Sequence, residues 1–438
     1  MVYEAALHAA RPAVLAAAPF NEKLRRGVHG RASSMRALRS WAESSRDHDR
    51  PLLWLHAPSV GEALMAGAIL AAAQQRAPHV QSLFTFFSPS AERVAQRVGA
   101  DWAGYLPWDL RSTVRAALRL ARPDVVAFVR TEIWPVLVRE AQRQGASTVL
   151  VNAVLAAGSS RAGRAARMLL GSAYARLDAV GVVSEDDIPR FGRLGVSPAR
   201  ISVTGDARFD QVCKRVQQLD RDRPLLRSLS AASGLTLVAG STWPEDEEPL
   251  LAALSELRDD GRPWRLVIAP HEPTATHVGG IERRLDAVGM SHARLPAIDA
   301  LAPADVQAFV VDRTGVLADL YAVAHAAWVG GGFGSAGLHS VIEPAALGVP
   351  VLYGPRHGNA REAQLLADAG GGTVARSTAE IRAALAALHD DPLHRRHTGD
   401  AARAFVAAHA GGADRNAHLI LRHLPPSPHP PHPPISLR

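Results

Sequence analysis

The stretch LWLHAPSVGEALMAGAIL, residues 53–70, joins a run of apolar residues to an alanine-rich segment with helical spacing. Short apolar runs bounded by turn residues are typical of buried strands, whereas apolar residues three and four positions apart are typical of a helix. We therefore expect a strand that ends at His56, a turn, and a helix that begins near Ser59. A strand followed directly by a helix is the repeating unit of a parallel α/β sheet.

The same alternation recurs along the chain in two series. A chain of 438 residues is longer than one hydrophobic core usually supports, so two Rossmann-like domains facing across a cleft are expected. We place an N-terminal helical segment at 1–48, a first domain at 49–210, a connector and second domain at 211–424, and a disordered Pro-rich tail at 425–438. The strand-like runs are 51–57, 82–88, 125–131, 147–155 and 179–184 in the first half, and 235–242, 264–270, 308–312, 326–331 and 350–355 in the second.

The composition is that of an ordinary globular protein, with 47% hydrophobic and 21% charged residues. A net charge of +7 is compatible with anionic partners. Aromatic residues are scarce at 5%, and no arginine-rich stripe carries interleaved aromatic residues, which argues against a nucleic-acid surface. A single cysteine, Cys213, excludes an internal disulfide and fits a reducing compartment such as the cytoplasm.

The first twenty residues are apolar but lack the basic region and cleavage site of a secretory signal. Glu4, His8, Arg11 and Pro12 interrupt them, so they are a poor membrane-spanning helix. Residues 21–50 are strongly basic. An apolar helix beside a basic segment can lie on an anionic leaflet, or it can pack against the protein itself, and the sequence leaves both possibilities open.

Ser59 and Glu62 have the spacing of a capping box, in which each side chain bonds a backbone N–H at the start of a helix. A functional interpretation is also open. The turn follows a strand, at the edge where parallel sheets bind their ligands, and Gly61 allows a close approach of another group. A glutamate at this place could act as a general base on a hydroxyl group.

The second distinctive segment is WVGGGFGSAGLHSVIEPAALGVPVLYGP, residues 328–355. Glycine-rich backbone that leads into a helix start is typical of an anion site, because free N–H groups and the helix dipole favour phosphate. Glu343 lies in the expected first turn, where it could accept hydrogen bonds from a ribose. Tight packing of helix on strand is the alternative reason for the glycines, but it does not explain Glu343.

Smaller signals flank these two segments. The acids of residues 245–248 follow a strand, and we expect them to be exposed partners of a helix dipole. Arg130 and Glu132 follow another strand as a charge pair that is either functional or a simple salt bridge, and His271 ends a third. The sequence contains no metalloprotease, P-loop or catalytic-triad motif and no Asp-x-Asp metal motif.

Taken in order, these segments resemble the 3-deoxy-D-manno-octulosonic acid (Kdo) transferases, which are glycosyltransferases of the two-domain GT-B type. The resemblance extends over nearly the whole chain. It rests on LHAPSVGEA, FTFFSPSAERV, YLPWDL, RTEIWP, VNAVL, VTGDARFD, AGSTWPEDEE, APHEP, GVLADLYAVAHAAWVGGGFG, GLHSVIEPAALGVPV and GPRHGNARE.

The resemblance implies transfer of Kdo from CMP-Kdo to a lipid A precursor in lipopolysaccharide synthesis. It implies inversion and neither a catalytic metal nor another cofactor. The first domain would bind the acceptor and the second the donor, with peripheral or monotopic contact at the cytoplasmic side of the bacterial inner membrane. Nucleic acid is not an expected partner.

The same resemblance assigns roles to residues of this chain. Glu62 matches the catalytic base, and Arg208 matches a basic residue that stabilises charge in the transition state, with Arg130 as a further catalytic candidate. Ser59, Gly61 and Glu132 lie on the acceptor side. The donor-contacting positions are Pro270, His271, Thr314, Gly315, Val316, Ser340, Val341, Ile342 and Glu343.

The chain departs from the family pattern at several of these positions. Arg130 stands in place of a glutamate, His271 in place of an arginine, and Ser340 in place of an asparagine, while the element that begins at Asn152 lacks its arginine and serine. Two alternatives therefore stay open: a GT-B transferase with another donor, such as a UDP-sugar or another CMP-linked acidic sugar, and a catalytically silent relative that binds the lipid A precursor or a partner protein.

Overall fold

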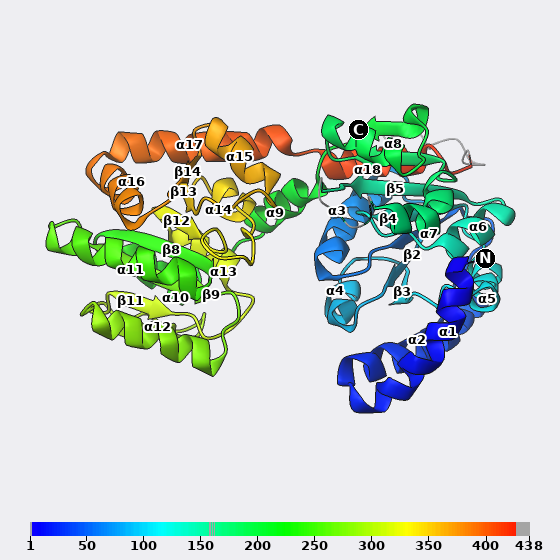
Figure 1. Cartoon of the computed structure of the whole chain (residues 1–438), viewed down its shortest axis with the longest axis horizontal. Coiled ribbons are helices and arrows are strands. Elements are labelled where there is room, and N and C mark those ends of the chain that lie inside the picture. Colours follow the sequence, from blue (N-terminus) through cyan, green and yellow to red (C-terminus); the bar gives the residue numbers. More distant parts are fainter. Residues whose placement is uncertain (1, 157–158, 160, 162, 426–438) are drawn as a thin grey trace, which may run out of the picture. The chain divides into compact units, whose positions relative to one another are not determined.

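The computed structural model describes residues 2–156, 159, 161 and 163–425. The chain divides into two α/β units (Figure 1), one formed by Met1–Gln211 with Ala410–Arg438 and the other by Val212–His409. Each unit contains one seven-stranded sheet in which the paired strands run parallel, so the expected fold class is confirmed. Except for Pro425, the expected tail lies outside the described residues.

The first sheet has the strand order β3-β2-β1-β4-β5-β6-β7. Its central strands are buried on both faces, as the continuous apolar runs of the sequence require. The strands are β1 (Leu52–His56), β2 (Gln81–Phe86), β3 (Trp102–Tyr105), β4 (Val125–Val129), β5 (Ser147–Ala153), β6 (Ala179–Val182) and β7 (Ile201–Val203).

Helices cover both faces of this sheet. Leu38 and Trp41 of α2 join the buried cluster of one face with α5 and α6, and α3 packs on the other face together with α18. The helices of the first unit are α1 (Val2–Ala17), α2 (Glu22–Ser44), α3 (Val60–Arg76), α4 (Glu92–Ala95), α5 (Arg111–Ala121), α6 (Pro135–Arg143), α7 (Arg164–Tyr174), α8 (Ile188–Arg193) and α18 (Gly412–Leu421), with α9 (Ala207–Gln217) crossing the boundary.

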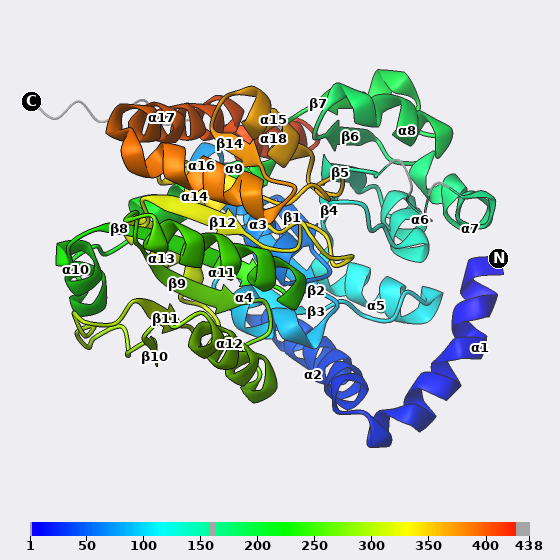
Figure 2. The ribbon, with the colours of Figure 1, turned by 60° about the vertical axis from the view of Figure 1, so that its left-hand side comes forward.

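The second sheet has the strand order β10-β11-β9-β8-β12-β13-β14. Helices α11, α12 and α16 pack on one face through leucine and isoleucine side chains, and Figure 2 shows α11 and α16 along that face. The strands are β8 (Leu235–Thr242), β9 (Trp264–Pro270), β10 (His292–Arg294), β11 (Ala308–Val310), β12 (Ala326–Val329), β13 (Val351–Tyr353) and β14 (Gly372–Val374). The helices are α10 (Pro224–Ala231), α11 (Pro244–Asp259), α12 (Ala275–Ala287), α13 (Leu317–Leu320), α14 (Ile342–Ala346), α15 (Arg361–Asp368), α16 (Thr378–Asp390) and α17 (Pro392–His409).

Helix α18 belongs to the first unit, although we expected the second domain to continue to residue 424. Its apolar residues Ala413, Ala417 and Ile420 are buried in the same cluster as α3. The sequence signal for a helix at this place is local, whereas the face that the helix covers is set by packing with residues more than 300 positions away.

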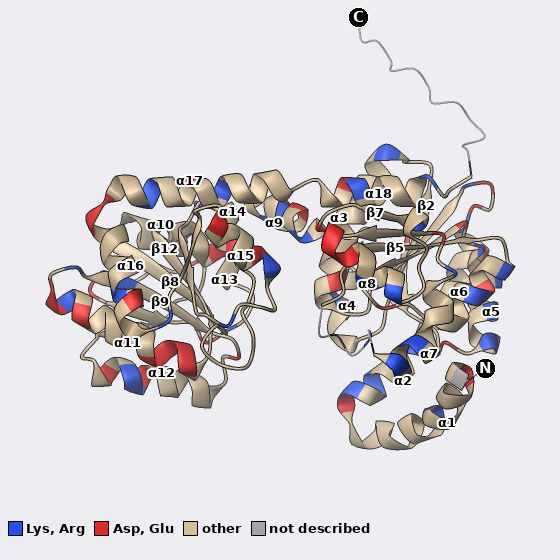
Figure 3. Cartoon of the chain, turned by 45° about the horizontal axis from the view of Figure 1, so that its top comes forward, with Lys and Arg blue, Asp and Glu red and all other residues tan. Residues whose placement is uncertain are grey.

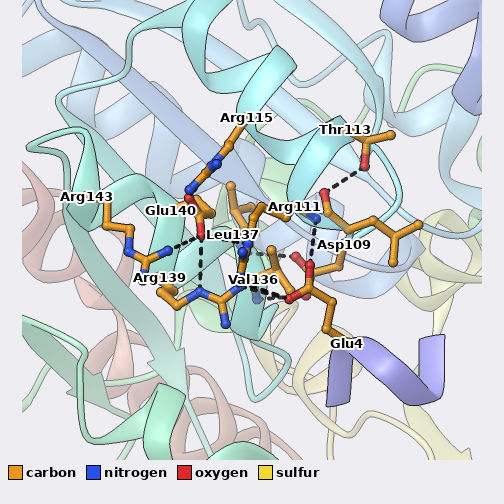
Figure 4. Close-up of polar contacts among 11 residues, drawn as sticks. Glu4, Asp109, Arg111, Thr113, Arg115, Val136, Leu137, Arg139, Glu140 and Arg143 are labelled. Carbon is orange, nitrogen blue, oxygen red and sulfur yellow. Dashed lines mark hydrogen bonds and ion pairs between the residues drawn. The ribbon is translucent and has the colours of Figure 1, made fainter. Parts of the chain in front are cut away.

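The N-terminal helices lie on the first unit. The beginning of α1 is attached by charged groups (Figure 4), because Glu4 accepts hydrogen bonds from the Arg111 backbone N–H (3.1 Å) and from the Arg139 side chain (3.1 Å). Farther along, Phe20 is 92% exposed. Figure 3 shows that α1 carries few charged residues whereas α2 carries several basic ones. Within the described residues, no helix combines the length and apolar character that crossing a membrane requires.

Candidate active site

The first sheet reverses its strand order between β1 and β4, and such switch points in parallel sheets are where ligands bind. A pocket of about 340 Å³ lies at the carboxyl ends of these strands. Three of the candidate residues, Glu62, Arg130 and Glu132, therefore come together in one site. The lining residues are Pro58, Glu62, Arg130, Thr131, Glu132, Val154, Leu155, Ala156, Ser159 and Arg161.

Glu62 lies in the first turn of α3, as expected, but the capping box is not formed. Ser59 occupies the cap position without bonding a backbone N–H, and its hydroxyl donates to the carboxylate of Glu62 instead. A capping serine accepts a backbone N–H through its oxygen, whereas this serine acts as a donor to the carboxylate. The partly exposed carboxylate therefore lines the pocket and is not used to hold the helix end.

Arg130 directly follows β4 in a strained conformation, with φ at +82°. A non-glycine residue in this region costs about 1–3 kcal/mol and is most often found at functional sites. Its backbone N–H donates to the carbonyl of Val151 (2.9 Å) on the neighbouring strand. Glu132 forms an ion pair with Arg161 across the pocket (3.3 Å).

Arg208 lies at the start of α9 and forms an ion pair with the nearly buried Asp206 (2.8 Å). Burial raises the pKa of the Asp206 carboxyl, but the charge and hydrogen bonds of Arg208 and the charge of Arg130 outweigh it, so the pKa lies below its usual range. The carboxylate is therefore ionised at neutral pH and serves as a counter-charge to two candidate catalytic arginines.

Aromatic residues of differing exposure support the turn at Pro58. They range from the buried His56 through the partly buried Trp134 to Phe87, which is 38% exposed. Trp134 donates its indole N–H to Nε2 of His56 (2.9 Å) and stacks on Phe87 with ring centroids 5.0 Å apart. The backbone N–H of Phe87 donates to the carbonyl of Pro58 (3.3 Å). Burial lowers the pKa of His56 to about 3, so its ring is neutral, accepts through Nε2 and carries its proton on Nδ1 toward Thr85 (3.0 Å).

The second sheet has its own switch point, between β8 and β12. We expected the acids of residues 245–248, after β8, to be exposed. This expectation is wrong in part, because Asp246 and Glu247 are fully buried. Asp246 accepts the backbone N–H groups of Gly331 (2.7 Å) and Phe333 (3.2 Å). The chain's own carboxylate thus occupies N–H groups that the sequence assigned to a bound anion.

Glu247 is held by three side chains, through Thr242 (3.0 Å), His277 (2.8 Å) and Arg284 (3.1 Å). It is a structural group rather than an exposed partner of the helix dipole. For Asp246, burial raises the pKa of the carboxyl. The backbone hydrogen bonds from Gly331, Trp243 and Phe333 lower this pKa, but they offset the effect of burial only in part.

His271 directly follows β9 and lies in a stack of three rings. Trp243 is on one side at 4.9 Å between centroids, and His339 is on the other at 4.4 Å. Burial and the neighbouring charge of His271 lower the pKa of His339 to about 4, so His339 is neutral at neutral pH. The stack joins His271 to the residue that precedes Ser340, which brings two separated donor candidates to one place.

The remaining donor candidates lie around α14 and α13. Val341 and Ile342 are fully buried, backbone included, and the Ile342 N–H donates to the hydroxyl oxygen of Ser340 (3.4 Å). Glu343 lies 4.0 Å from Arg215, which also contacts Asp319 of α13 (3.5 Å). Burial raises the pKa of Glu343, and Arg215 opposes the shift.

Thr314, Gly315 and Val316 immediately precede α13, and Gly315 has φ at +89°. Pro270, the last residue of β9, pairs with Thr242 of β8 after a shift in register at Ser241. Through the described part of the chain, no three His, Cys, Asp or Glu side chains gather as a metal site would require.

Comparison with solved structures identifies the architecture. A UDP-GlcNAc 2-epimerase from Neisseria meningitidis, bound to UDP-GlcNAc, aligns with a TM-score of 0.57 at 14% identity, over 85% of this chain and 99% of that chain. A glycosyltransferase from Rickettsia africae aligns with a TM-score of 0.55 at 11% identity, over 86% and 97%. The two parallel-sheet units therefore define a GT-B fold.

Sequence comparison shows which proteins the chain resembles. Residues 30–211 match the family model described as 3-Deoxy-D-manno-octulosonic-acid transferase (kdotransferase). A 3-deoxy-D-manno-octulosonic acid transferase of Bordetella pertussis is 28% identical over 84% of this chain and 86% of the relative, and one of Haemophilus influenzae is 25% identical over 85% and 87%. The chain is therefore similar to these glycosyltransferases over most of its length.

Proposed function

We propose that this chain transfers Kdo from CMP-Kdo to a sugar hydroxyl of a lipid A precursor, with inversion and without a catalytic metal. The observation that carries the proposal is the pocket at the switch point of the first sheet. It places a carboxylate, Glu62, beside an arginine, Arg130, and a second carboxylate, Glu132, in a chain that is similar to the Kdo transferases.

Glu62 acts as the general base. Its carboxylate takes the proton of the acceptor hydroxyl while the hydroxyl oxygen forms a bond to the anomeric carbon of Kdo. The bond between that carbon and the phosphate oxygen of CMP breaks, and CMP departs with the electron pair. Since Ser59 donates to the carboxylate of Glu62, the orientation of the base is set before the acceptor arrives.

Arg208 and Arg130 supply positive charge for the phosphate that carries negative charge as CMP leaves. Fixed positive groups aimed at developing charge are among the largest contributors to enzymatic rates. Arg208 is held by Asp206, and Arg130 by the strained backbone after β4, so both are placed by the fold.

The second unit binds CMP-Kdo in this proposal. The ring stack around His271 offers a flat surface, and the partly exposed residues Ser340 and Glu343 offer a hydroxyl and a carboxyl group for the nucleotide. Thr314, Gly315, Val316 and Pro270 lie at the neighbouring strand ends or loops.

The acceptor is a lipid, so the first unit works at a membrane surface. The exposed apolar side of α1 and the basic residues of α2 form the surface that meets the cytoplasmic side of the inner membrane. This contact is peripheral or monotopic, and the attachment of α1 through Glu4 keeps the helix on the protein body at its first turn.

The decisive experiment is a transfer assay with purified protein, CMP-Kdo generated in situ, and tetraacyl lipid A precursor in detergent. A gain of one or more Kdo masses on the acceptor supports the proposal and counts the additions. Parallel reactions with a UDP-sugar and with another CMP-linked acidic sugar test the donor. No gain with CMP-Kdo, together with a gain in a parallel reaction, would assign another donor, and no gain in any reaction would favour a binding role.

A further inference from the structure

Asp206 lies in the turn between β7 and α9, and its side chain is 4% exposed. One carboxylate oxygen contacts both Nε and a terminal nitrogen of Arg208, each at 2.8 Å. The other oxygen accepts the backbone N–H of Arg208 (2.9 Å). The side chain of Arg208 is 29% exposed and that of Asp206 is 4% exposed, so the pair has one partly exposed and one buried member.

Asn152, at the end of β5, supports this carboxylate from the sheet. It is buried and has φ at +51°, a conformation that asparagine tolerates better than most residues. Its side-chain oxygen accepts the N–H of Ala207 (2.7 Å), and its amide nitrogen donates to Asp206 (3.4 Å) and contacts the sulfur of Met65 (3.0 Å). Met65 follows Glu62 by one turn on α3, so Asn152 connects the start of α9 to the helix of the proposed base.

Helix α18 also contacts this turn. The side-chain oxygen of Asn416 accepts the backbone N–H of Asn152 (2.8 Å) and the hydroxyl of Thr204 (2.9 Å). At Gly412, an added Cβ would lie 2.7 Å from the backbone carbon of Asp206, so helix and turn are in direct contact. The backbone around Asp206 is therefore held by contacts with both β5 and α18.

We infer that Asp206 is a positioning residue that holds the guanidinium of Arg208 in one orientation toward the charge that develops on departing CMP. The inference rests on the proposed function and extends it to a residue that contacts neither substrate. An arginine side chain has many rotamers, and a donor that is oriented beforehand stabilises a transition state better than one that must be ordered during the reaction.

The test is the Asp206→Asn variant, which keeps the shape of the side chain and removes its charge. We expect kcat for Kdo transfer to fall by about 10- to 100-fold, as for loss of other supporting residues, while KM for CMP-Kdo changes by less than about threefold. Arg208→Lys should lose a similar factor because an ammonium group cannot keep the two-nitrogen contact. The double variant should be no slower than the slower single variant, because the two residues act as one unit.

Asp178→Asn is the matched control. Asp178 accepts the backbone N–H (2.7 Å) and the hydroxyl (3.0 Å) of Thr148, at the amino end of β5, whereas Asn152 lies at the carboxyl end of that strand. This variant should lower the melting temperature and leave kcat within about twofold of the parent. If the parent is active and Asp206→Asn has an unchanged kcat, the positioning role is wrong while the proposed function stands. The same holds if the losses of the two single variants multiply in the double variant. A parent that transfers no Kdo would overturn the proposed function and this role with it.

Discussion

The hydroxyl of Ser59 donates a hydrogen bond to the carboxylate of Glu62, three residues later in the first turn of α3. The same Ser-x-x-Glu spacing occurs at Ser377 and Glu380, and there the serine oxygen accepts the backbone N–H of Glu380 (3.3 Å) as a cap should. One spacing thus gives two arrangements in one chain. At Glu62 the carboxylate is turned toward a pocket, and at Glu380 toward the backbone N–H of Arg376 (3.0 Å).

Glu62→Gln should keep the fold and lose transfer. The amide oxygen can still accept the hydrogen bond of Ser59, but it cannot accept the acceptor's proton, so kcat should fall by about 10²- to 10⁴-fold. Initial rates by mass spectrometry and a melting curve separate the two effects. Glu380→Gln, a first-turn glutamate in the second unit, should change neither. Near-normal turnover in Glu62→Gln would exclude Glu62 as the base.

Gly61→Ala should separate stability from acceptor binding. An added Cβ at this position meets no protein atom within 4 Å, so packing does not require glycine here. Alanine favours a helix by about 0.5–1 kcal/mol over glycine, and the melting temperature should hold or rise. KM for the acceptor should increase because the methyl group enters the space beside Glu62.

The control for this substitution is Gly192→Ala in α8, where an added Cβ also meets open space. Gly192→Ala should leave KM for the acceptor unchanged. If Gly61→Ala binds the acceptor as well as the parent does, the acceptor does not approach this turn.

His271→Ala should weaken donor binding. The substitution removes the middle ring of the stack between Trp243 and His339, so KM for CMP-Kdo should rise by about tenfold, which corresponds to about 1.4 kcal/mol. KM for the acceptor should stay constant. Steady-state rates with each substrate varied in turn provide the measurement. His292→Ala, on strand β10, serves as the control, and equal donor KM values in both variants would remove His271 from the donor site.

The low pKa of the buried His56 should make the folded protein less stable in acid. The pKa of His56 is about 3 in the folded protein and about 6.5 in an unfolded chain, so below about pH 6.5 the unfolded chain takes up a proton that the folded chain does not. The stability that the neutral ring provides is complete above that pH and is lost progressively toward pH 3. Between pH 7 and pH 5 the loss is about 2 kcal/mol.

To isolate this effect, the free energy of unfolding in urea is measured at pH 7 and pH 5 for the parent and for His56→Gln. The parent should lose about 2 kcal/mol more than the variant. The comparison is needed because burial raises the pKa of Asp109 to about 6, which changes stability in the opposite direction over the same range. Equal losses in parent and variant would show that His56 takes up its proton without unfolding.

The sequence predicts the interior of both sheets and misses their edges. All ten strand-like runs correspond to strands, whereas β3, β7, β10 and β14, the two outer strands of each sheet, were not predicted. These strands have three or four residues and are partly exposed. A strand with one neighbour needs no continuous apolar run, so it leaves little periodic signal in the sequence.

The candidate site was predictable where strand ends carry charged residues and unpredictable where charges are buried. Glu62, Arg130 and Glu132 follow predicted strands and line one pocket. Asp246 instead bonds Gly331, which lies 85 positions away, and Asp206 bonds both its near neighbour Arg208 and the distant Asn152, so no local pattern shows which acid will be buried. Asn152 had one local signal, since asparagine at a strand end is suited to a positive φ.

The return of α18 to the first unit has a consequence for biosynthesis. A ribosome makes all of residues 212–409 before it supplies the helix that supports the turn at Asp206. The first unit therefore cannot reach its final packing while it emerges, and must wait, with the α3 face uncovered, until the second unit has been synthesised. A chain shortened before residue 412 would lose this cover from its first domain while the strands and helices of its second domain stayed complete.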